Sequence, residues 1–567
     1  MKKINTISIF LLVLIFGLGT ILPLFHRGFF EFHDNTQVER VYEMGVALGD
    51  KSFPVRWVPD LGYGYGYPIF NFYAPFPYYM GGMLLISGIG ALLATKIMFA
   101  FGILLSGISM YFLTKKFFGV GAGVVSSIVY MYFPYHAVNV YVRGAVGEFF
   151  AYAAIPLVFL GLLQLIESKK TTLISSENFR TVCLTSLAIF LVATSHNLSI
   201  FMFLILLVPF MVVSFFLARN KKSFLILSAT SVVLGFMLSA FYILPAFLEM
   251  SYTNVGSQVG GGAYAPDHFV CPSQFVDSIW GFGGSTKECM DGLSFRIGKV
   301  NMLLAVLGLI LLTHVFYRRK IERHDKLAFI SLVLLFCSVF LSLSVSRFVW
   351  DNIPFMQYIQ YPWRFMNFIG LFVSIIAAYC VFKISKYFGK KGILLVVLII
   401  ILTLFTNLKL FNPQDYNNYS DSHFTSQNHI RFETSKISDE YLPSGFQTPN
   451  SVYELPIATV ELLKTSGNIG VIKEHTGYLK ASYQALSDGV AHVNYAYFPG
   501  WKANVNGEKM PIVPTSNGMN ISIKKGSGQL ELKLVQTPIE VAGNTITILA
   551  FLVLLLGIIK TSLNSKK

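Results

Sequence analysis

Long apolar runs recur along most of this chain and limit what it can fold into more than any other feature. The 567 residues are 54% hydrophobic and only 13% charged, about half the charged fraction of a typical soluble protein. Apolar runs of this length cross a bilayer as helices, because the helix satisfies its own backbone hydrogen bonds. The sequence therefore predicts a polytopic α-helical membrane protein.

The apolar runs predict about twelve transmembrane helices. We expect residues 1–25 to act as a retained signal-anchor, because the run is long and shows no small-residue cleavage site. The expected spans are roughly 6–25, 96–114, 120–135, 149–166, 182–196, 198–218, 223–244, 300–316, 327–345, 365–384, 392–408 and 541–559.

The basic residues indicate how these spans are oriented. They cluster in short loops between spans, including Lys115-Lys116, Lys221-Lys222 and Arg318-Arg319-Lys320. Short basic loops are typical of the cytoplasmic side. This pattern explains the net charge of +15 without nucleic acid. We expect a multi-pass plasma-membrane protein with both termini in the cytoplasm, provided that residues 77–94 do not cross the bilayer.

With this topology the long polar segments share the extracytoplasmic face. The first domain, residues 1–408, has outer loops at 26–95, 136–148, 245–299 and 346–364. The second, 409–540, begins as an irregular segment and continues as alternating apolar and polar runs such as GYLKASYQAL, VAHVNYAYFPGW and QLELKLVQ. Such alternation predicts strands, and Asn506-Gly507 and Asn517-Gly518 predict hairpin turns. A last helix and a basic tail, 541–567, complete the chain.

Asp34 is the first candidate for chemistry, because it directly follows the first span with His33 beside it. Gln37 lies three residues later, so Asp34 fits a helix N-cap. A carboxylate there also fits a general base acting on a hydroxyl group, and the two roles are compatible. The following helix, expected at 35–48, places Glu39 and Glu43 on one face, which most often is solvated.

The segment FPVRWVPDLGYGYGYP supplies two candidates for substrate binding. Its alternating glycines exclude a stable helix, and it lacks the context of a nucleotide-binding loop. Tyr65 fits a sugar-stacking wall or an interfacial aromatic belt. Arg56 is suited to bind a phosphate group or, alternatively, to form an ion pair with Asp60.

Four further candidates lie near the outer ends of spans. Arg143 and Glu148 are ionisable groups near membrane depth, where charge is costly and often functional; a structural ion pair is the alternative. His196 lies between two spans. It either belongs to a simple turn or donates a hydrogen bond to a phosphate or diphosphate. Arg364 fits phosphate binding or snorkelling to the interface. Cys271 and Cys289 share one outer loop, and an oxidising compartment would allow a disulfide between them.

Several motifs carry a family resemblance along nearly the whole chain. They are HDNTQVERVYEMGVAL, FPVRWVPDLGYGYGYPIFNFYAPFPYY, VRGAVGEF, WGFGGS, DGLSFRIG, QYPWRF, EYLP and YFPGWKANVNG. They resemble the bacterial membrane-protein family labelled "6-pyruvoyl-tetrahydropterin synthase-related", which is similar in plan to YfhO-type proteins and to GT-C glycosyltransferases. The pterin part of that label does not fit, because pterin synthases are small zinc enzymes with clustered histidines, and here eleven histidines are scattered without an H-x-H pair.

The GT-C resemblance implies a polyprenyl-phosphate sugar donor, an outward-facing site and an acid in the first outer loop. Asp34 matches that acid, and Glu148 matches the second acid of some members. The first loop contains no D-x-D pair, so we expect no obligatory metal and no other cofactor. The acceptor would be a glycan, lipid or protein, with the β-rich domain binding it or capping the site. Two alternatives remain open, a lipid or polysaccharide transporter and a non-catalytic scaffold of cell-envelope assembly.

Overall fold

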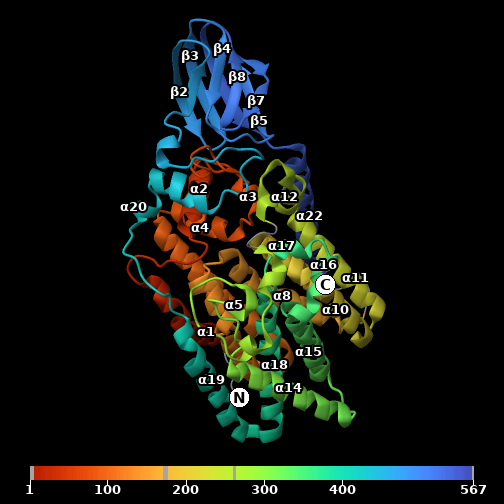
Figure 1. The fold of residues 1–567 in the computed structure, drawn as a ribbon. Helices are drawn as coiled ribbons and strands as arrows, with labels where there is room; N and C mark the ends of the chain where they lie inside the picture. The colour runs from red at the N-terminus through yellow and green to blue at the C-terminus, as the bar shows by residue number, and fades with distance from the viewer. Residues whose placement is uncertain (1–5, 170–175, 259–262, 565–567) are drawn as a thin grey trace.

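The protein folds into a helical body with a β-sandwich at one end (Figure 1). The structure, a computed structural model, describes residues 6–169, 176–258 and 263–564. The chain enters the sandwich from the helical body and returns through a final long helix, which runs from the sandwich along the side of the body (Figure 1).

Each predicted span coincides with a helix. The helices are α1 (Thr6–Ile21), α5 (Ala91–Phe118), α6 (Val120–Met131), α8 (Val146–Leu165), α9 (Ser176–Ser195), α10 (Asn197–Leu217), α11 (Lys221–Leu238), α14 (Lys299–Tyr317), α15 (Arg323–Ser342), α18 (Met366–Phe388), α19 (Gly392–Asn407) and α22 (Pro538–Asn564). Within the described ranges, 9 helical segments are long and apolar enough to cross a membrane, and one of them contains both α18 and α19. The prediction of a polytopic helical protein is confirmed, and the exact number of crossings stays a prediction.

Residues 77–94 do not form a spanning helix. They contain α4 (Phe76–Ile86), a helix of 11 residues, and the start of α5. A helix of that length is about 16 Å long, roughly half the thickness of the hydrocarbon core. The helix α4 packs against α2 (Gln37–Gly49), and a Cβ atom on Gly81 would lie 2.6 Å from Val41. The segment therefore packs on the loop that follows α1 and is too short to span, which agrees with the predicted orientation.

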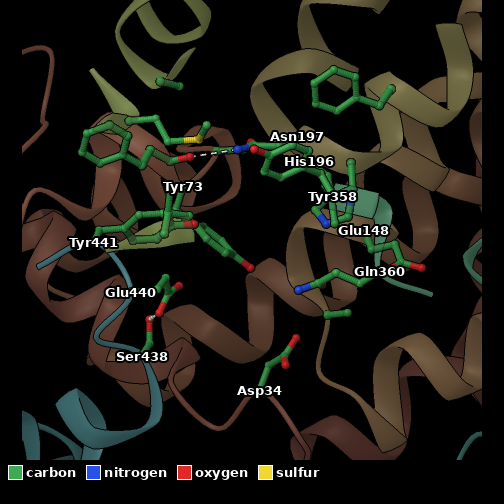
Figure 2. A pocket seen from close by; sticks show the side chains of 18 of the residues that line it. Asp34, Tyr73, Glu148, His196, Asn197, Tyr358, Gln360, Ser438, Glu440 and Tyr441 are labelled. Atoms are coloured by element: carbon green, nitrogen blue, oxygen red, sulfur yellow. Dashed lines mark hydrogen bonds between the residues drawn. The ribbon is translucent and has the colours of Figure 1, made fainter. Parts of the chain in front are cut away.

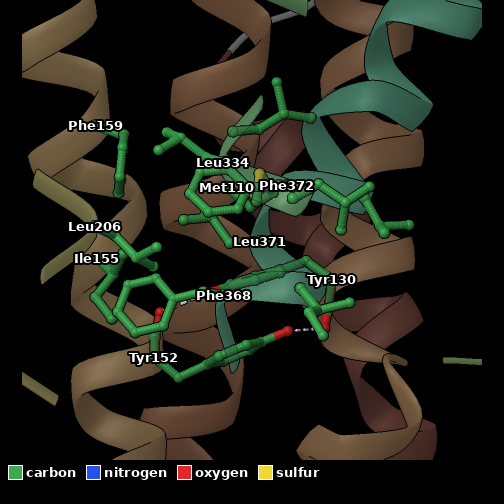
Figure 3. Close-up of a cluster of buried hydrophobic side chains, with 14 of the residues drawn as sticks. Met110, Tyr130, Tyr152, Ile155, Phe159, Leu206, Leu334, Phe368, Leu371 and Phe372 are labelled. Atoms are coloured by element: carbon green, nitrogen blue, oxygen red, sulfur yellow. Dashed lines mark hydrogen bonds between the residues drawn. The ribbon is translucent and has the colours of Figure 1, made fainter. Parts of the chain in front are cut away.

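Buried aromatic side chains hold the helical body together (Figure 3). Tyr130 and Tyr152 stack with ring centroids 3.9 Å apart. Each hydroxyl donates to the other residue's carbonyl oxygen, at 2.7 and 2.9 Å. Phe159 meets Phe372 edge to face. Because an unpaired polar group is costly inside a membrane protein, the reciprocal tyrosine bonds let two hydroxyls occupy an otherwise apolar core.

Short helices surround the outer end of the body. They are α3 (Ile69–Phe72), α7 (Pro134–Ala137), α12 (Ala240–Leu248), α13 (Pro272–Val276), α16 (Arg347–Asn352), α17 (Met356–Ile359), α20 (Asp421–Phe424) and α21 (Ser435–Ile437). A disulfide joins Cys271 and Cys289, the pairing that the shared outer loop allowed.

The segment before the sandwich, residues 409–459, contains only helical turns and irregular chain, as predicted. It is not a loose linker, because it packs on the first outer loop. Phe29 and Asn417 form a β-bridge, and Asp421 accepts a hydrogen bond from the Leu92 main chain. His429 contacts Glu39 at 2.8 Å. The segment thereby covers α2 and brings residues 437–441 to the helical body.

The β-rich domain is a sandwich of two antiparallel sheets. The strands are β1 (Val460–Leu463), β2 (Gly467–His475), β3 (Tyr478–Ala485), β4 (Gly489–Val493), β5 (Trp501–Val505), β6 (Glu508–Met510), β7 (Ile512–Thr515), β8 (Gly518–Ile523) and β9 (Gly526–Leu534). The sheet orders are β1-β4-β8-β7 and β2-β3-β9-β5-β6.

The predicted turns and strands of this domain are largely confirmed. Asn506 and Gly507 both have positive φ and join β5 to β6, as a type I′ hairpin requires. Asn517 lies in the turn between β7 and β8, and Gly518 is the first residue of β8, paired with Thr515. One prediction is wrong, because VAHVNYAYFPGW is not one strand: β4 ends at Val493 and β5 starts at Trp501, after Pro499.

Candidate functional site

A cavity of about 410 Å³ lies at the outer end of the helical body, where α8, α10 and α12 meet the first outer loop (Figure 2). Its polar lining residues are Asp34, Thr36, Arg40, Tyr73, Arg143, Glu148, His196, Asn197, Tyr358, Gln360, Arg364, Ser438, Glu440 and Tyr441. Its apolar lining residues are Phe72, Ala74, Ala145, Leu198, Phe201, Ala246, Phe247, Met250, Val255, Phe355 and Ile437. The cavity brings together five of the eight predicted site residues, namely Asp34, Arg143, Glu148, His196 and Arg364.

Glu148 sits in the first turn of α8 between two arginines. Its Oε2 accepts a hydrogen bond from Arg143 Nη1 at 2.8 Å and lies 3.7 Å from Arg364 Nε. Its Oε1 accepts from the Tyr135 hydroxyl at 3.1 Å and from Asn367 Nδ2 at 2.7 Å. The side chain is fully buried. A carboxylate with this many donors fixes the arginines and is poorly suited to take up a proton.

The two guanidinium groups are held in fixed positions beside the cavity. Arg143 lies over the Trp363 ring at 4.8 Å and Arg364 over the Tyr361 ring at 5.1 Å. Arg364 Nη1 also donates to the Ile359 carbonyl. Its Nε is buried and makes no hydrogen bond with any described residue. Among the described residues, Glu148 is the only carboxylate paired with these two cations, and Asp34, whose charge also acts on Arg143, is the next acid in the cavity. The two guanidinium groups can therefore hold an anionic ligand here.

Two glycines of the VRGAVGEF motif allow this arrangement. Gly144 has φ +61°, and a Cβ atom there would lie 2.1 Å from the Phe32 ring. A Cβ atom on Gly147 would lie 2.6 Å from the Ser195 carbonyl oxygen. Gly144 therefore lets the chain turn sharply after Arg143, and Gly147 lets the start of α8 approach the end of α9.

His196 caps the N-terminus of α10. Its Nδ1 accepts the main-chain N–H of Ser199 at 3.2 Å. In the neutral imidazole the ring proton must then be on Nε2, which leaves a donor for a ligand. Asn197, the next residue, donates to the Phe72 carbonyl at 2.9 Å and thereby fixes this turn against the first outer loop.

Asp34 has an unengaged carboxylate that points into the cavity (Figure 2). Its main-chain N–H donates to the Arg143 carbonyl oxygen at 2.9 Å, so the backbone is fixed. Its carboxylate makes no hydrogen bond or ion pair with any of the described residues. The predicted N-cap role is wrong, because α2 begins after Thr36 and no side chain caps it. Gln37 instead donates to the Asp34 and Gly144 carbonyl oxygens.

The opposite side of the cavity contains residues that the sequence did not indicate (Figure 2). Arg40 donates to the Ser438 hydroxyl at 2.9 Å and stacks on Tyr73 at 4.4 Å. Ser438 donates in turn to Glu440 at 3.0 Å. Burial raises the pKa of the Glu440 carboxyl, and the charge of Arg40 opposes that rise.

The expectation of a solvated face on α2 is wrong. Glu39, Arg40 and Glu43 are all buried, with exposed fractions of 2%, 4% and 0%. The segment 409–459 covers this face, and helical spacing alone gives no sign of a cover that comes from so far along the chain.

Three predicted substrate-binding residues do not line the cavity. Arg56 is buried and contacts Glu540 at 3.6 Å and Asn71 at 2.7 Å, so its alternative pairing with Asp60 is wrong. Tyr65 packs edge to face on Phe446. His33 lies beside Asp34, but its Nε2 contacts the Phe282 carbonyl at 2.9 Å.

Metal binding has no obvious ligand set here. In the described part of the chain, no group of three or more His, Cys, Asp or Glu side chains could hold a metal ion. Metal independence stays a prediction.

Several solved structures are similar to this one over part of their length. The oligosaccharyltransferase of Archaeoglobus fulgidus in its apo form has a TM-score of 0.47 at 13% identity, over 81% of this chain and 62% of that one. The arabinofuranosyltransferase AftD from Mycobacteria has a TM-score of 0.45 at 12% identity, over 72% of this chain and 27% of that one. ArnT from Cupriavidus metallidurans, bound to undecaprenyl phosphate, has a TM-score of 0.33 at 11% identity, over 68% and 79%. The chain spans about three fifths of the length of the oligosaccharyltransferase.

A comparison with curated proteins finds no match. A family model for membrane proteins, described as the 6-pyruvoyl-tetrahydropterin synthase related domain, matches residues 70–412. The match includes α4 to α19 and the part of the cavity formed by Arg143, Glu148, His196 and Arg364. It covers more than half of the chain, and the protein therefore belongs to this family of membrane proteins.

Proposed function

We propose that this protein is a membrane glycosyltransferase of the GT-C type that moves a sugar from a polyprenyl-phosphate donor to an acceptor hydroxyl. The observation that carries the proposal is the polarity of one cavity. An apolar wall leads to two fixed arginines, and an unengaged carboxylate lies across from them.

The apolar wall suits the lipid chain. Leu198 and Phe201 belong to α10, and Phe247 and Phe355 are 47% and 63% exposed at the surface of the body. Further along α10, Val208, Val212 and Phe216 are also exposed. An exposed apolar stripe that continues into the cavity gives a polyprenyl chain a path from the bilayer to the polar end.

The polar end suits the phosphate. Arg143 and Arg364 would hold it as charged donors, with His196 Nε2 as a further donor. The buried Nε of Arg364 and the buried hydroxyl of Thr36 make no hydrogen bond with any described residue, so a ligand would satisfy both. Glu148 then acts as a positioning residue that orients the arginines, which revises its expected role as a second catalytic acid.

Asp34 is suited to act as the base. The acceptor oxygen would form a bond to the anomeric carbon while the bond from that carbon to the phosphate oxygen breaks. Asp34 would take the acceptor proton, and the lipid phosphate would leave with its charge neutralised by the arginines. Attack opposite the leaving group inverts the anomeric carbon. Positioning and charge stabilisation would supply most of the acceleration.

The orientation of the site follows from the basic loops. With those loops in the cytoplasm, the cavity and the sandwich lie on the extracytoplasmic face of the plasma membrane, where glycan, lipid or protein acceptors of the envelope are found.

The test uses the full chain in proteoliposomes with polyprenyl-phosphate hexoses and pentoses that carry a labelled sugar. Asp34→Asn should lower transfer by about a hundredfold or more while retaining binding of polyprenyl phosphate, because only proton removal is lost. Arg364→Gln should weaken that binding. Asp351→Asn, in an exposed ion pair with Arg347, is the matched control. Transfer by Asp34→Asn at the wild-type rate, or flux of lipid-linked sugar without transfer, would contradict the proposal.

A further inference from the structure

A second cavity, of about 460 Å³, lies where the end of α2 meets the base of the sandwich. Three separate parts of the chain form it. They are the outer loop at residues 50–60, the segment before the sandwich at Gln427, Arg431 and Thr459, and the sandwich at residues 474–477 and Tyr495. Figure 1 shows the sandwich seated over α2 and α20 at this junction. None of the residues assigned to donor binding or chemistry lines this cavity.

The carboxylates of this cavity are held in place by the protein. Asp50, just after α2, accepts hydrogen bonds from the main-chain N–H and the hydroxyl of Thr476, at 2.8 and 2.7 Å. Glu474 accepts from the Tyr495 hydroxyl at 2.7 Å. Each carboxylate keeps further lone pairs, so these groups are preorganised acceptors for hydroxyl donors.

A donor with unused capacity faces these acceptors. Arg431 Nη2 lies 3.6 Å from Asp60 Oδ1, which is beyond hydrogen-bond distance. Its Nε is buried without a hydrogen bond to any described residue. The two groups form an ion pair that is too long for a direct hydrogen bond, and a ligand hydroxyl can bridge it by accepting from Arg431 and donating to Asp60.

Rigid aromatic side chains form one wall. Tyr495 stacks on Trp501 at 5.2 Å, and Trp57 meets Trp501 edge to face at 5.5 Å. Trp57 and Tyr495 line the cavity, and the buried Trp501 packs against both. Trp57 comes from the outer loop and Tyr495 from the sandwich, so this wall exists only when the two are docked. Aromatic walls combined with preorganised acceptors and donors suit a ring that presents C–H groups on one face and hydroxyls at its edge.

The balance of charge in this cavity disfavours an anionic ligand. Asp50, Asp60 and Glu474 outnumber the one permanent cation, Arg431, so a phosphate or another anion would be repelled. In the described ranges, no group of three or more His, Cys, Asp or Glu side chains could hold a metal ion, so this cavity has no metal-ligand set.

We propose that this cavity binds an uncharged saccharide, as a glycan subsite distinct from the donor site. If the proposed transferase function holds, the bound saccharide is the outer part of the acceptor. The helix α2 connects the two cavities: Arg40 lines the first and Asp50 lines the second, a separation of about 15 Å along the axis. An acceptor longer than a single sugar would occupy both.

The test measures binding without transfer, so that its outcome is independent of the proposed reaction. The full chain in detergent is titrated against fluorescent neutral oligosaccharides of glucose, galactose and mannose, and against a phosphorylated oligosaccharide. Glu474→Ala and Arg431→Ala should each weaken binding of a neutral oligosaccharide about tenfold, because each removes hydrogen bonds to the ligand. Glu508→Ala removes the same negative charge as Glu474→Ala, but from an exposed hairpin. It should bind the oligosaccharide as the wild type does.

Asp34→Asn separates this proposal from the previous one. It should bind the neutral oligosaccharide normally, whether or not it transfers sugar. If each variant unfolds near the wild-type temperature, a loss of binding comes from the changed site and not from unfolding. The proposal is overturned if no neutral oligosaccharide binds the wild type, if only the phosphorylated one binds, or if both cavity variants bind as tightly as Glu508→Ala.

Discussion

The main-chain N–H of Asp34 donates to the carbonyl oxygen of Arg143 at 2.9 Å. This bond joins the first and second outer loops and places the unengaged carboxylate beside the arginine cluster. His33 makes the equivalent bond to Val142 at 3.1 Å. The distance between the proposed base and the proposed phosphate site is therefore set by backbone pairing, which a substitution of Asp34 itself leaves in place.

Gly144→Ala should disrupt this pairing. The added Cβ would lie 2.1 Å from Phe32 at a φ of +61°, so the turn after Arg143 must shift. We expect a loss of stability of about 1–3 kcal/mol and a larger loss of transfer. Gly121→Ala in α6 is the control, because nothing lies within 4 Å of its added Cβ. Thermal unfolding in micelles measures the loss of stability, and a transfer assay measures the loss of transfer. Equal stability and equal transfer in Gly144→Ala and Gly121→Ala would contradict the expectation.

Glu148→Gln should destabilise the protein strongly. It leaves Arg143 and Arg364 buried without a neutralising charge, and breaking a buried ion pair typically costs about 3–5 kcal/mol. Asp351→Asn breaks an exposed pair with Arg347 and should cost at most about 1 kcal/mol. Denaturant titration in mixed micelles compares the two. If added polyprenyl phosphate restores much of the lost stability, the excess positive charge is the cause.

Arg56→Met should loosen the attachment of α22. Arg56 contacts Glu540 at 3.6 Å, and its neighbour Asn71 donates to Glu249 at 2.8 Å. Removing the cation leaves buried carboxylates without their counter-charge, at a cost of about 3–5 kcal/mol. The double variant Arg56→Met, Glu540→Leu should be more stable than Arg56→Met alone. A double variant that is less stable than the single one would show that the pair is not coupled.

Glu43→Gln should stabilise the protein increasingly as the pH rises. Burial first, and then the charge of Asp60, raise the pKa of the Glu43 carboxyl well above 4.5. Above about pH 4.5 the folded state keeps a proton that the unfolded chain releases. The stability of the wild type therefore falls as the pH rises above about 4.5. Glutamine does not titrate and can still accept the bond from the Asp60 main chain. The difference in unfolding temperature between the two proteins should grow from about pH 5 to pH 7.5, whereas Glu508→Gln should show no such trend.

The helices and turns were predictable because local signals determine them. Apolar runs identified every long helix, and Asn506-Gly507 identified a hairpin, since both patterns act over a few residues. The partners within the site are far apart in sequence. Nothing near Arg40 indicates that Ser438 will contact it, and nothing near Arg56 indicates Glu540. Asp34 was found by its position after a span, but its predicted N-cap role failed because pairing with Arg143 draws the chain away from the helix start.

The position of residues 437–441 has a consequence for how this protein can be divided. Ser438, Glu440 and Tyr441 line the cavity, although they belong to the segment that leads into the sandwich. A chain cut at residue 408 would keep the arginines and Asp34 and yet lack one side of the cavity. The segment and the sandwich therefore form one outer unit: exchanging residues 409–540 between relatives would also exchange one side of this cavity.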